Sequence, residues 1–501
     1  MGNMLDRTIA WFSPSRAVRR AHARKVLSYY EAGKPDRQRK QRRESGSGDT
    51  AVLRAGTSLR EQARHFDQNH DISRGVLNTL VQNIVGPHGI GVEFQPRTSD
   101  GDIHDDTANR LQELWRQWSR RPEATWDHDW ASAQRIMART WLRDGEALSQ
   151  ILRGTIRGLL HGSRVPFSLE LIEPDLLPLN YNTDSPNITA GVERNGWNRP
   201  VAFHILKEHP GNASVWNIDT KRVSADRILH LKLTDRIGQS RGVSIFASVM
   251  SRIDDIKDYE ESERIAAKVA ASMAAYIKKG APDTYDAEVN DDGEEQARDL
   301  RFAPGMVFDD LEPGEEIGTI DTTRPNSNLE PHRNGQLRAL SAGTGVTYSS
   351  CSKDYNGTYS AQRQELVEGW GAYGVLASEF ISQFVRPVQE QFVAMCELAG
   401  LIEIPDNINR ETLDDALFIP PQMPWIDPLK EANSWVVLEG AGYASGPEII
   451  RRRGGNPRDV IEQESRWKRM QKEKGISTSV EITTNDTDEE GNTNAKTRIS
   501  L

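Results

Sequence analysis

Few residues of this 501-residue chain have types and spacings that could support chemistry. His128 stands between Asp127 and Asp129, and an imidazole with two carboxylates could bind zinc. The same acids suit the first turn of a helix, where carboxylates stabilise free backbone N–H groups, and we prefer that explanation. Cys351 has a nearby cation, Lys353, but no histidine or asparagine partner that would make it a nucleophile. The sequence therefore contains no convincing catalytic group.

Nucleotide-binding and hydrolase motifs are missing. No G-x-x-x-x-G-K-[ST], H-E-x-x-H or G-x-S-x-G sequence occurs. Gly86, Gly89 and Gly91 resemble a glycine-rich loop, but they follow a helical stretch, whereas the dinucleotide-binding fingerprint follows a strand. We expect turn glycines here and, for the whole chain, no enzyme activity, no cofactor and no metal site.

The composition predicts a globular protein outside membranes. The net charge is −10, and 37% of residues are hydrophobic while 27% are charged. No apolar run approaches the roughly eighteen residues of a membrane span, and the first residues lack a continuous apolar signal segment. Cys351 and Cys396 cannot build a disulfide framework, so we expect a reducing compartment.

Charge is distributed unevenly along the chain. Residues 1–44 contain twelve Lys and Arg against four Asp and Glu, whereas residues 281–321 contain fourteen acids against two arginines. The stretch 33–50 is nearly free of apolar residues and is expected to be flexible, either as a solvated arm or as a contact for nucleic acid phosphates. The acidic segment lacks the pattern of a calcium loop, so we expect a solvated or DNA-repelling surface.

Helices and then a small β module must position any site in the N-terminal half. Apolar residues at helical spacing predict helices over 59–85, 105–120 and 130–144. The turn signals Asn195-Gly196 and Pro210-Gly211 predict antiparallel hairpins. The predicted strands cover residues 147–152, 167–172, 201–206 and 228–233.

Longer helices dominate the C-terminal half. Residues 242–280 are predicted to form one helix, with Ser244 as N-cap and Lys278 and Lys279 in its last turn. Helical spacing continues over 362–398, and Pro387 predicts a kink near 383–386 because it removes a backbone hydrogen bond. Shorter predicted elements are strands at 306–308 and 316–320, a helix at 328–340, a mobile polar loop at 341–360, helices at 430–440, 447–453 and 458–474, and a disordered tail at 476–501.

Several short sequence strings are spread over roughly residues 15–475. None of them identifies a family by itself, but their order along the chain is fairly specific. They are Arg64 to Gly91, Gly145-Glu146, Glu173-Pro174-Asp175, Gly191-Val192-Glu193, Arg199 to His204, His209-Pro210, Arg236 to Val243, Leu311 to Glu316, Arg338 to Arg363 and Trp425 to Glu431. In this order they resemble the lambda-type portal (head–tail connector) proteins of tailed bacteriophages. The chain departs from that pattern at Tyr348 to Cys351, where related sequences more often have Tyr-Glu.

The resemblance implies an α+β, mainly helical portal fold with wing, stem, clip and crown, in a ring around a central channel. The implied division is a basic flexible arm (1–55), a wing of helices and a β module (56–241), a stem helix (242–280), an acidic clip (281–325), a second stem helix (326–341), a tunnel loop (342–360), a long kinked wing helix and return (361–424), a crown (425–475) and a disordered tail (476–501).

The resemblance also implies a function, a set of partners and a location. The ring, of twelve subunits, would stand at the capsid vertex of a siphovirus-type virion and carry double-stranded DNA during packaging and ejection. Its partners would be terminase, head–tail connector or adaptor proteins and the major capsid or scaffold protein, with assembly in the bacterial cytoplasm and no membrane contact. The implied DNA-channel residues are Lys353, Tyr355 and Asn356 in the tunnel loop and Lys278 and Lys279 at the stem end. The implied acidic clip surface is Asp291, Asp292, Glu294 and Glu295.

A different class of function remains as an alternative. A packaging enzyme or nuclease could hold DNA through the basic arm and the cluster Arg451 to Arg453. The missing phosphate-binding loop argues against a motor.

Overall fold

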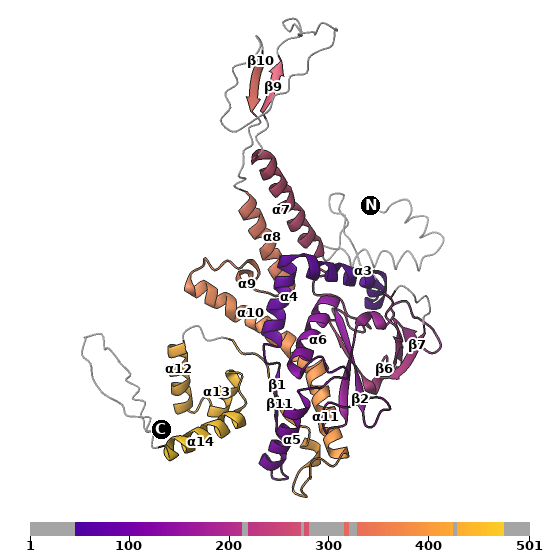
Figure 1. Ribbon diagram of the computed structural model, residues 1–501, viewed down its shortest axis with the longest axis vertical. Helices are drawn as coiled ribbons and strands as arrows, with labels where there is room; N and C mark the ends of the chain where they lie inside the picture. The colour runs from indigo at the N-terminus through magenta and orange to yellow at the C-terminus, as the bar shows by residue number, and fades with distance from the viewer. Residues whose placement is uncertain are drawn as a thin grey trace, which may run out of the picture.

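A computed structural model describes residues 46–212, 219–271, 275–279, 315–319, 328–423 and 428–474. In this part the chain is mainly helical with small antiparallel sheets, as the sequence predicts (Figure 1). The predicted basic arm up to residue 45, the four predicted clip acids, the strand at 306–308 and the C-terminal tail lie outside the described residues. None of the described helices is long and apolar enough to cross a membrane.

Helices form the body of the molecule, and the predicted second and third helices are confirmed. The predicted helix over 59–85 is instead two helices, because His70 adopts an extended backbone between them. The first of the two begins at Gly48, inside the stretch expected to be flexible, since Ser47 caps it and Asp49 accepts a hydrogen bond from the backbone of Ser240. These helices are α3 (Gly48–Asn69), α4 (Asp71–Ile84), α5 (Asp105–Trp118) and α6 (Trp130–Asp144).

Aromatic side chains fill the core between these helices and the C-terminal long helix. Trp118 is completely buried, stacks on Phe167 and donates a hydrogen bond to its carbonyl oxygen. Phe392 packs edge-on against Trp115, with ring centroids 4.9 Å apart. Buried aromatic rings of this size each remove a large apolar area from water, so this cluster holds the body together.

The β module consists of two antiparallel sheets, and its hairpins are confirmed. One sheet has the order β3-β2-β8 and the other the order β4-β5-β6-β7. A second apolar cluster, which includes Leu148, Phe203 and Ile228, draws residues from both sheets. The strands are β2 (Glu146–Arg153), β3 (Phe167–Ile172), β4 (Ile188–Thr189), β5 (Val192–Arg194), β6 (Pro200–Leu206), β7 (Thr220–Ser224) and β8 (Ile228–Lys232). A separate pair joins β1 (Gly91–Phe94) to β11 (Ala416–Ile419).

Two helices, α7 (Met250–Ala271) and α8 (Leu329–Thr344), project side by side from the body (Figure 1). Arg333 Nε lies 2.5 Å from Glu260 Oε1, and Arg252 donates a 2.8 Å hydrogen bond to Gln336, so polar pairs connect the two helices. Beyond their far ends, β9 (Ala275–Lys279) pairs with β10 (Glu315–Thr319). The predicted strand at 316–320 is therefore confirmed, and the predicted helix at 328–340 extends four residues further.

The prediction of one helix over 242–280 is wrong at both ends. At its start Gly242 packs so closely on Gly145 that an added Cβ would lie 1.9 Å from the Gly145 carbonyl oxygen. This contact fixes the backbone in turns, and the helix begins only at Met250. At its end, Lys278 and Lys279 lie on β9, whose backbone pairs with β10 in register with Glu316 and Glu315, so this part of the chain is a strand.

The long C-terminal helix has its kink close to the predicted place. It consists of α10 (Tyr359–Phe380), a π-helical turn (Ile381–Val385) and α11 (Arg386–Leu398). Pro387 is the second residue of α11, one residue after the π turn, which agrees with a proline that cannot donate its backbone hydrogen bond. The three predicted terminal helices are confirmed as α12 (Pro428–Gly440), α13 (Gly446–Arg452) and α14 (Pro457–Glu473).

Candidate functional site

The structure separates the predicted DNA-channel residues into two groups. Lys353, Tyr355 and Asn356 follow the short helix α9 (Tyr348–Ser352), near the end of α8 that joins the body. Lys278 and Lys279 lie on β9, beyond the opposite end of α8 (Figure 1). The two groups therefore cannot form one contact site within a single chain.

The segment 342–360 is more ordered than the predicted mobile loop. Its first residues belong to α8, and α9 follows after a buried Val346. The Thr347 side chain caps α9, and the backbone N–H of Ser349 donates a 2.9 Å hydrogen bond to Glu365 on α10. These local and tertiary bonds offset the low apolar content from which mobility was predicted.

The turn between α9 and α10 presents its three predicted side chains to solvent. Lys353, Tyr355 and Asn356 are all exposed, Tyr355 to 60% of its surface. Lys353 adopts a left-handed backbone (φ 57°) and ends α9, while the side-chain amide of Gln362 donates a hydrogen bond to the Tyr355 carbonyl oxygen. This exposed cation is free to meet a phosphate without first breaking a salt bridge within the described residues.

Neither of the two groups considered for catalysis has reactive surroundings. Burial raises the pKa of the Cys351 thiol, which reduces the fraction of the nucleophilic thiolate. Asp129 is the N-cap of α6, and the hydrogen bond from the backbone of Ser132 lowers its pKa. The helix-start explanation is thus confirmed for Asp129, which caps α6, whereas the first turn of α6 itself contains no acid.

The arginines of the alternative hypothesis are bound within the chain. Arg451 forms a fork of hydrogen bonds to Glu93, at 2.9 and 3.0 Å. Arg452 pairs with Glu448 at 2.7 Å and lies over the ring of Trp435. The Arg451 guanidinium, held by a buried carboxylate, is poorly available to DNA, whereas the exposed Arg452–Glu448 pair is weak and opens at little cost.

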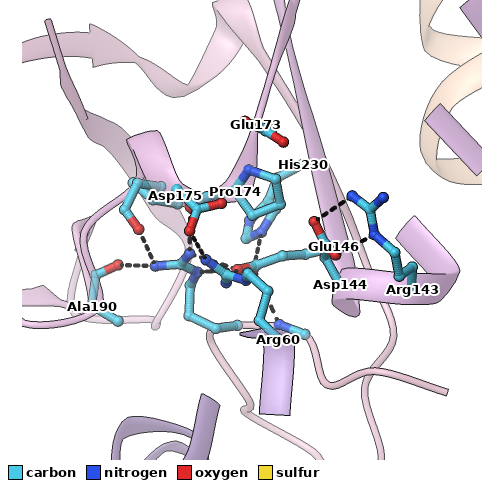
Figure 2. Close-up of polar contacts among 12 residues, drawn as sticks. Arg60, Arg143, Asp144, Glu146, Glu173, Pro174, Asp175, Ala190 and His230 are labelled. Carbon is cyan, nitrogen blue, oxygen red and sulfur yellow. Dashed lines mark hydrogen bonds and ion pairs between the residues drawn. The ribbon is translucent and has the colours of Figure 1, made fainter. Parts of the chain in front are cut away.

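A buried ionic cluster lies at the base of α7, and sequence reasoning did not identify it. Its centre is Glu146, the first residue of β2, whose side chain is completely buried (Figure 2). Arg60 of α3 donates a 2.6 Å hydrogen bond to Glu146 Oε1, and His230 Nε2 of β8 lies 2.9 Å from Oε2. Arg241 donates to both carboxylate oxygens, at 2.5 and 2.8 Å. We call Arg60, Arg64, Asp144, Glu146, Asp175, His230 and Arg241 the Glu146 cluster.

Two arginines balance the central carboxylate. Burial alone would raise the pKa of Glu146, but the charge of Arg241 and the hydrogen bond from His230 outweigh it and hold that pKa well below its ordinary value. Burial lowers the pKa of His230, so the imidazole is neutral at pH 7. The carboxylate is therefore ionised and fully paired.

Arg241 joins this cluster to two further chain segments. Its side chain is only 1% exposed, and besides Glu146 it donates to the carbonyl oxygens of Leu177 and Ala190 at 2.8 Å and of Pro174 at 3.3 Å. Because Arg241 directly precedes Gly242 and the turns that lead into α7, these bonds fix the base of the projecting helix pair to the β module.

At the edge of the Glu146 cluster, Asp175 and its neighbours Glu173 and His209 lie close enough together to hold a metal ion. Arg64 already pairs with Asp175, and it also donates a 2.7 Å hydrogen bond to Asp144. The charges of Arg60 and Arg64 lower the pKa of Asp175 against the opposing effect of burial. Two arginines beside the carboxylates repel a cation, so we assign no metal here.

Four of the strings that carried the resemblance supply members of this cluster. They are the strings that contain Arg64, Glu146, Asp175 and Arg241. The sequence therefore contained a signal for this cluster: its charged residues lie inside the short strings that carried the resemblance. Their contact could not be inferred, because Glu146 is 86 residues from Arg60 and 95 from Arg241 along the chain.

Comparisons with known proteins agree on one family. Residues 34–376 match the family model described as "Phage portal protein, lambda family". The chain is 26% identical over 455 residues to the "Probable portal protein" of Halomonas phage phiHAP-1, covering 87% of this chain and 84% of that protein. It is 23% identical over 329 residues to "Portal protein B" of Escherichia phage lambda, covering 59% of this chain and 61% of that protein.

Solved structures with a similar arrangement come from gene transfer agent (GTA) particles. A chain of "Neck of native GTA particle computed with C12 symmetry" aligns at 13% identity and a TM-score of 0.42, with 87% of this chain and 99% of that chain covered. A chain of "Virion of native gene transfer agent (GTA) particle" aligns at 12% identity and a TM-score of 0.45, with 82% and 99% covered.

Proposed function

This chain belongs to the lambda family of phage portal proteins, and from that membership we propose that twelve copies form the ring through which DNA enters and leaves the capsid. Portal function at the capsid vertex follows from the family. The observation that carries the proposal is the family match over residues 34–376, which spans the body, α7, α8 and most of α10.

We assign the parts of the ring to the elements of the chain. The stem consists of α7 and α8, the wing of the helical body with the β module, and the crown of α12 to α14. The clip corresponds to the region around β9 and β10, with Asp291, Asp292, Glu294 and Glu295 as its proposed acidic surface. An acidic wall repels DNA phosphates, which keeps the duplex sliding instead of bound.

The proposed tunnel contact is the exposed turn after α9. Lys353, Tyr355 and Asn356 present one cation and two polar groups, enough for transient phosphate contacts but too few for tight binding. Lys278 and Lys279 would meet DNA at another level of the channel, since they lie beyond the far end of the stem. Weak contacts with DNA at separate positions along the channel suit a protein through which DNA passes.

The proposed partners follow from this position. Terminase would supply the packaging motor, head–tail connector or adaptor proteins would dock after packaging, and the major capsid or scaffold protein would hold the ring in its vertex. Assembly would take place in the bacterial cytoplasm before the ring becomes part of the virion.

Native mass spectrometry of the purified chain tests the ring directly. We expect an assembly with about twelve times the 56.3 kDa mass of the chain. A stable monomer at micromolar concentration and physiological salt would contradict the proposal. Incubation with ATP, or with linear DNA and magnesium, should give only background turnover. Nuclease activity that is lost on substituting Asp127 or Asp129 would instead support the enzyme alternative.

A further inference from the structure

A pocket of about 600 Å³ opens between the two sheets of the β module, lined by residues of β5, β6 and β8 and of the turn before β8. The hairpin β5–β6 forms one wall and β8 the other. Its lining includes Arg194, Arg199, Val201, Asp226, His230 and Lys232. Three cations therefore share one concave surface.

These cations lack acidic partners. No carboxylate oxygen of the described residues lies within 4.0 Å of the charged nitrogens of Arg194, Arg199 or Lys232. Asp226 in the same pocket already pairs with Arg153 at 2.8 Å. Glu193, next to Arg194 in the chain, is held by Arg222. The positive charge of the pocket is thus not neutralised by its own walls.

Several hydrogen-bond donors in the pocket are unused. Lys232 Nζ donates to the Gln239 carbonyl oxygen at 2.8 Å, which leaves two of its three protons. Arg194 donates from Nη1 to the Asn198 carbonyl oxygen at 3.0 Å, but its buried Nε has no acceptor. The guanidinium of Arg199 is exposed and donates no side-chain hydrogen bond within the part of the chain that the structure describes. A buried donor without an acceptor is costly, and an anion would satisfy it.

The charges of the pocket also destabilise one another. Burial lowers the pKa of Arg194, and Asp49, which is already bound to Ser240, offsets this only in part. Burial and then the positive charge of Arg194 lower the pKa of Lys232. A bound anion would relieve both effects.

We propose that this pocket binds an acidic segment of a partner protein. Carboxylates would contact Arg194, Arg199 and Lys232, while apolar side chains would lie against Val201, which is 41% exposed, and Trp197 of the same hairpin, which is 93% exposed. A DNA duplex, whose major groove alone is about 12 Å wide, is too broad to enter a pocket of this volume. The proposed site goes beyond the portal function. If the acidic peptide does not bind, the test of the ring by native mass spectrometry is unaffected.

Fluorescence anisotropy with the full-length assembly tests the proposal. The probe is a short fluorescein-labelled peptide of glutamate and leucine, and its glutamine counterpart and a labelled DNA duplex serve as comparisons. The variants are Arg194→Gln and Arg199→Gln. Lys221→Gln, an equal charge change on an exposed residue of β7 outside the pocket, is the matched control.

We expect the acidic peptide to bind the wild type and each pocket variant to weaken it about tenfold, since a charged hydrogen bond is lost. The Lys221→Gln variant should bind the acidic peptide as the wild type does. The glutamine peptide should not bind. No binding of the acidic peptide would overturn the proposal. Equal weakening by Lys221→Gln, or an effect of the pocket variants on DNA instead of on the peptide, would also overturn it.

Discussion

The Glu146 cluster and the turn after α9 are both polar, yet they serve opposite purposes. In the cluster every charge has a partner, and the central carboxylate is completely buried. In the turn Lys353 and Tyr355 are exposed and make few bonds. A buried paired charge fixes geometry, because removing one partner leaves the other unpaired in a low dielectric. An exposed charge costs little to keep and can bind transiently, so the two regions separate anchoring from the proposed contact with DNA.

The largest expected effect is that of Glu146→Gln. The substitution keeps the shape of the side chain but leaves Arg60 and Arg241 without their shared anion, which should lower the free energy of unfolding by about 3–5 kcal/mol. Urea denaturation followed by circular dichroism measures it. The control is Glu368→Gln on the exposed face of α10, which should change stability by less than about 0.5 kcal/mol. If Glu146→Gln lowered the free energy of unfolding as little as Glu368→Gln does, the cluster would not be an anchor.

Gly242→Ala should have the next largest effect. The added Cβ would lie 1.9 Å from the Gly145 carbonyl oxygen, so the backbone beside the cluster must move, at a cost of about 1–3 kcal/mol. Gly75→Ala in α4 is the control, since nothing lies within 4 Å of its added Cβ and alanine favours a helix. The two variants should shift the urea midpoint in opposite directions. A shift in the same direction would contradict the close-packing argument.

Acid should weaken the cluster in two stages. The pKa of His230 in the fold is below its ordinary 6.5, so the unfolded chain takes up a proton first, and stability falls as the pH drops below about 6.5. The pKa of Glu146 is also depressed, so its contribution is present above about 4.5 and is lost as the pH falls below that value. Urea midpoints from pH 8 to pH 4 measure both stages. His230→Gln should shrink the first stage, to which His70, whose pKa burial also lowers, contributes as well, and should keep the second. An unchanged upper stage would exclude His230 as a source.

Lys353→Gln should have the smallest effect on stability. The side chain is exposed and has no salt bridge among the described residues, so the free energy of unfolding should change by less than about 0.5 kcal/mol. The yield of genome-filled particles should fall if the turn contacts DNA, and Lys353→Arg should restore it. Particle counts with a DNA stain measure the yield. A wild-type yield from Lys353→Gln would remove this residue from the channel contact.

Most helices and strands could be predicted because their signals are local. The bounds of α6 agree with the periodic pattern over 130–144, and the π turn before Pro387 agrees with the chemistry of proline. Predictions failed where a distant segment decided the backbone. The start of α7 depends on Gly145, and β9 depends on its pairing with β10.

The sequence by itself determined the order of elements, the absence of nucleotide-binding motifs and, through collinear strings, the family. Helical period, caps and turn residues act over a few positions, so they can be recognised without a structure. Only the tertiary structure decided which charges are buried together and which are exposed. Arg60, Glu146 and Arg241 stabilise one another only after α3, β2 and the chain before α7 have packed. Whether a charged side chain is buried in an ion pair or exposed to solvent depends on this packing and not on the residue type.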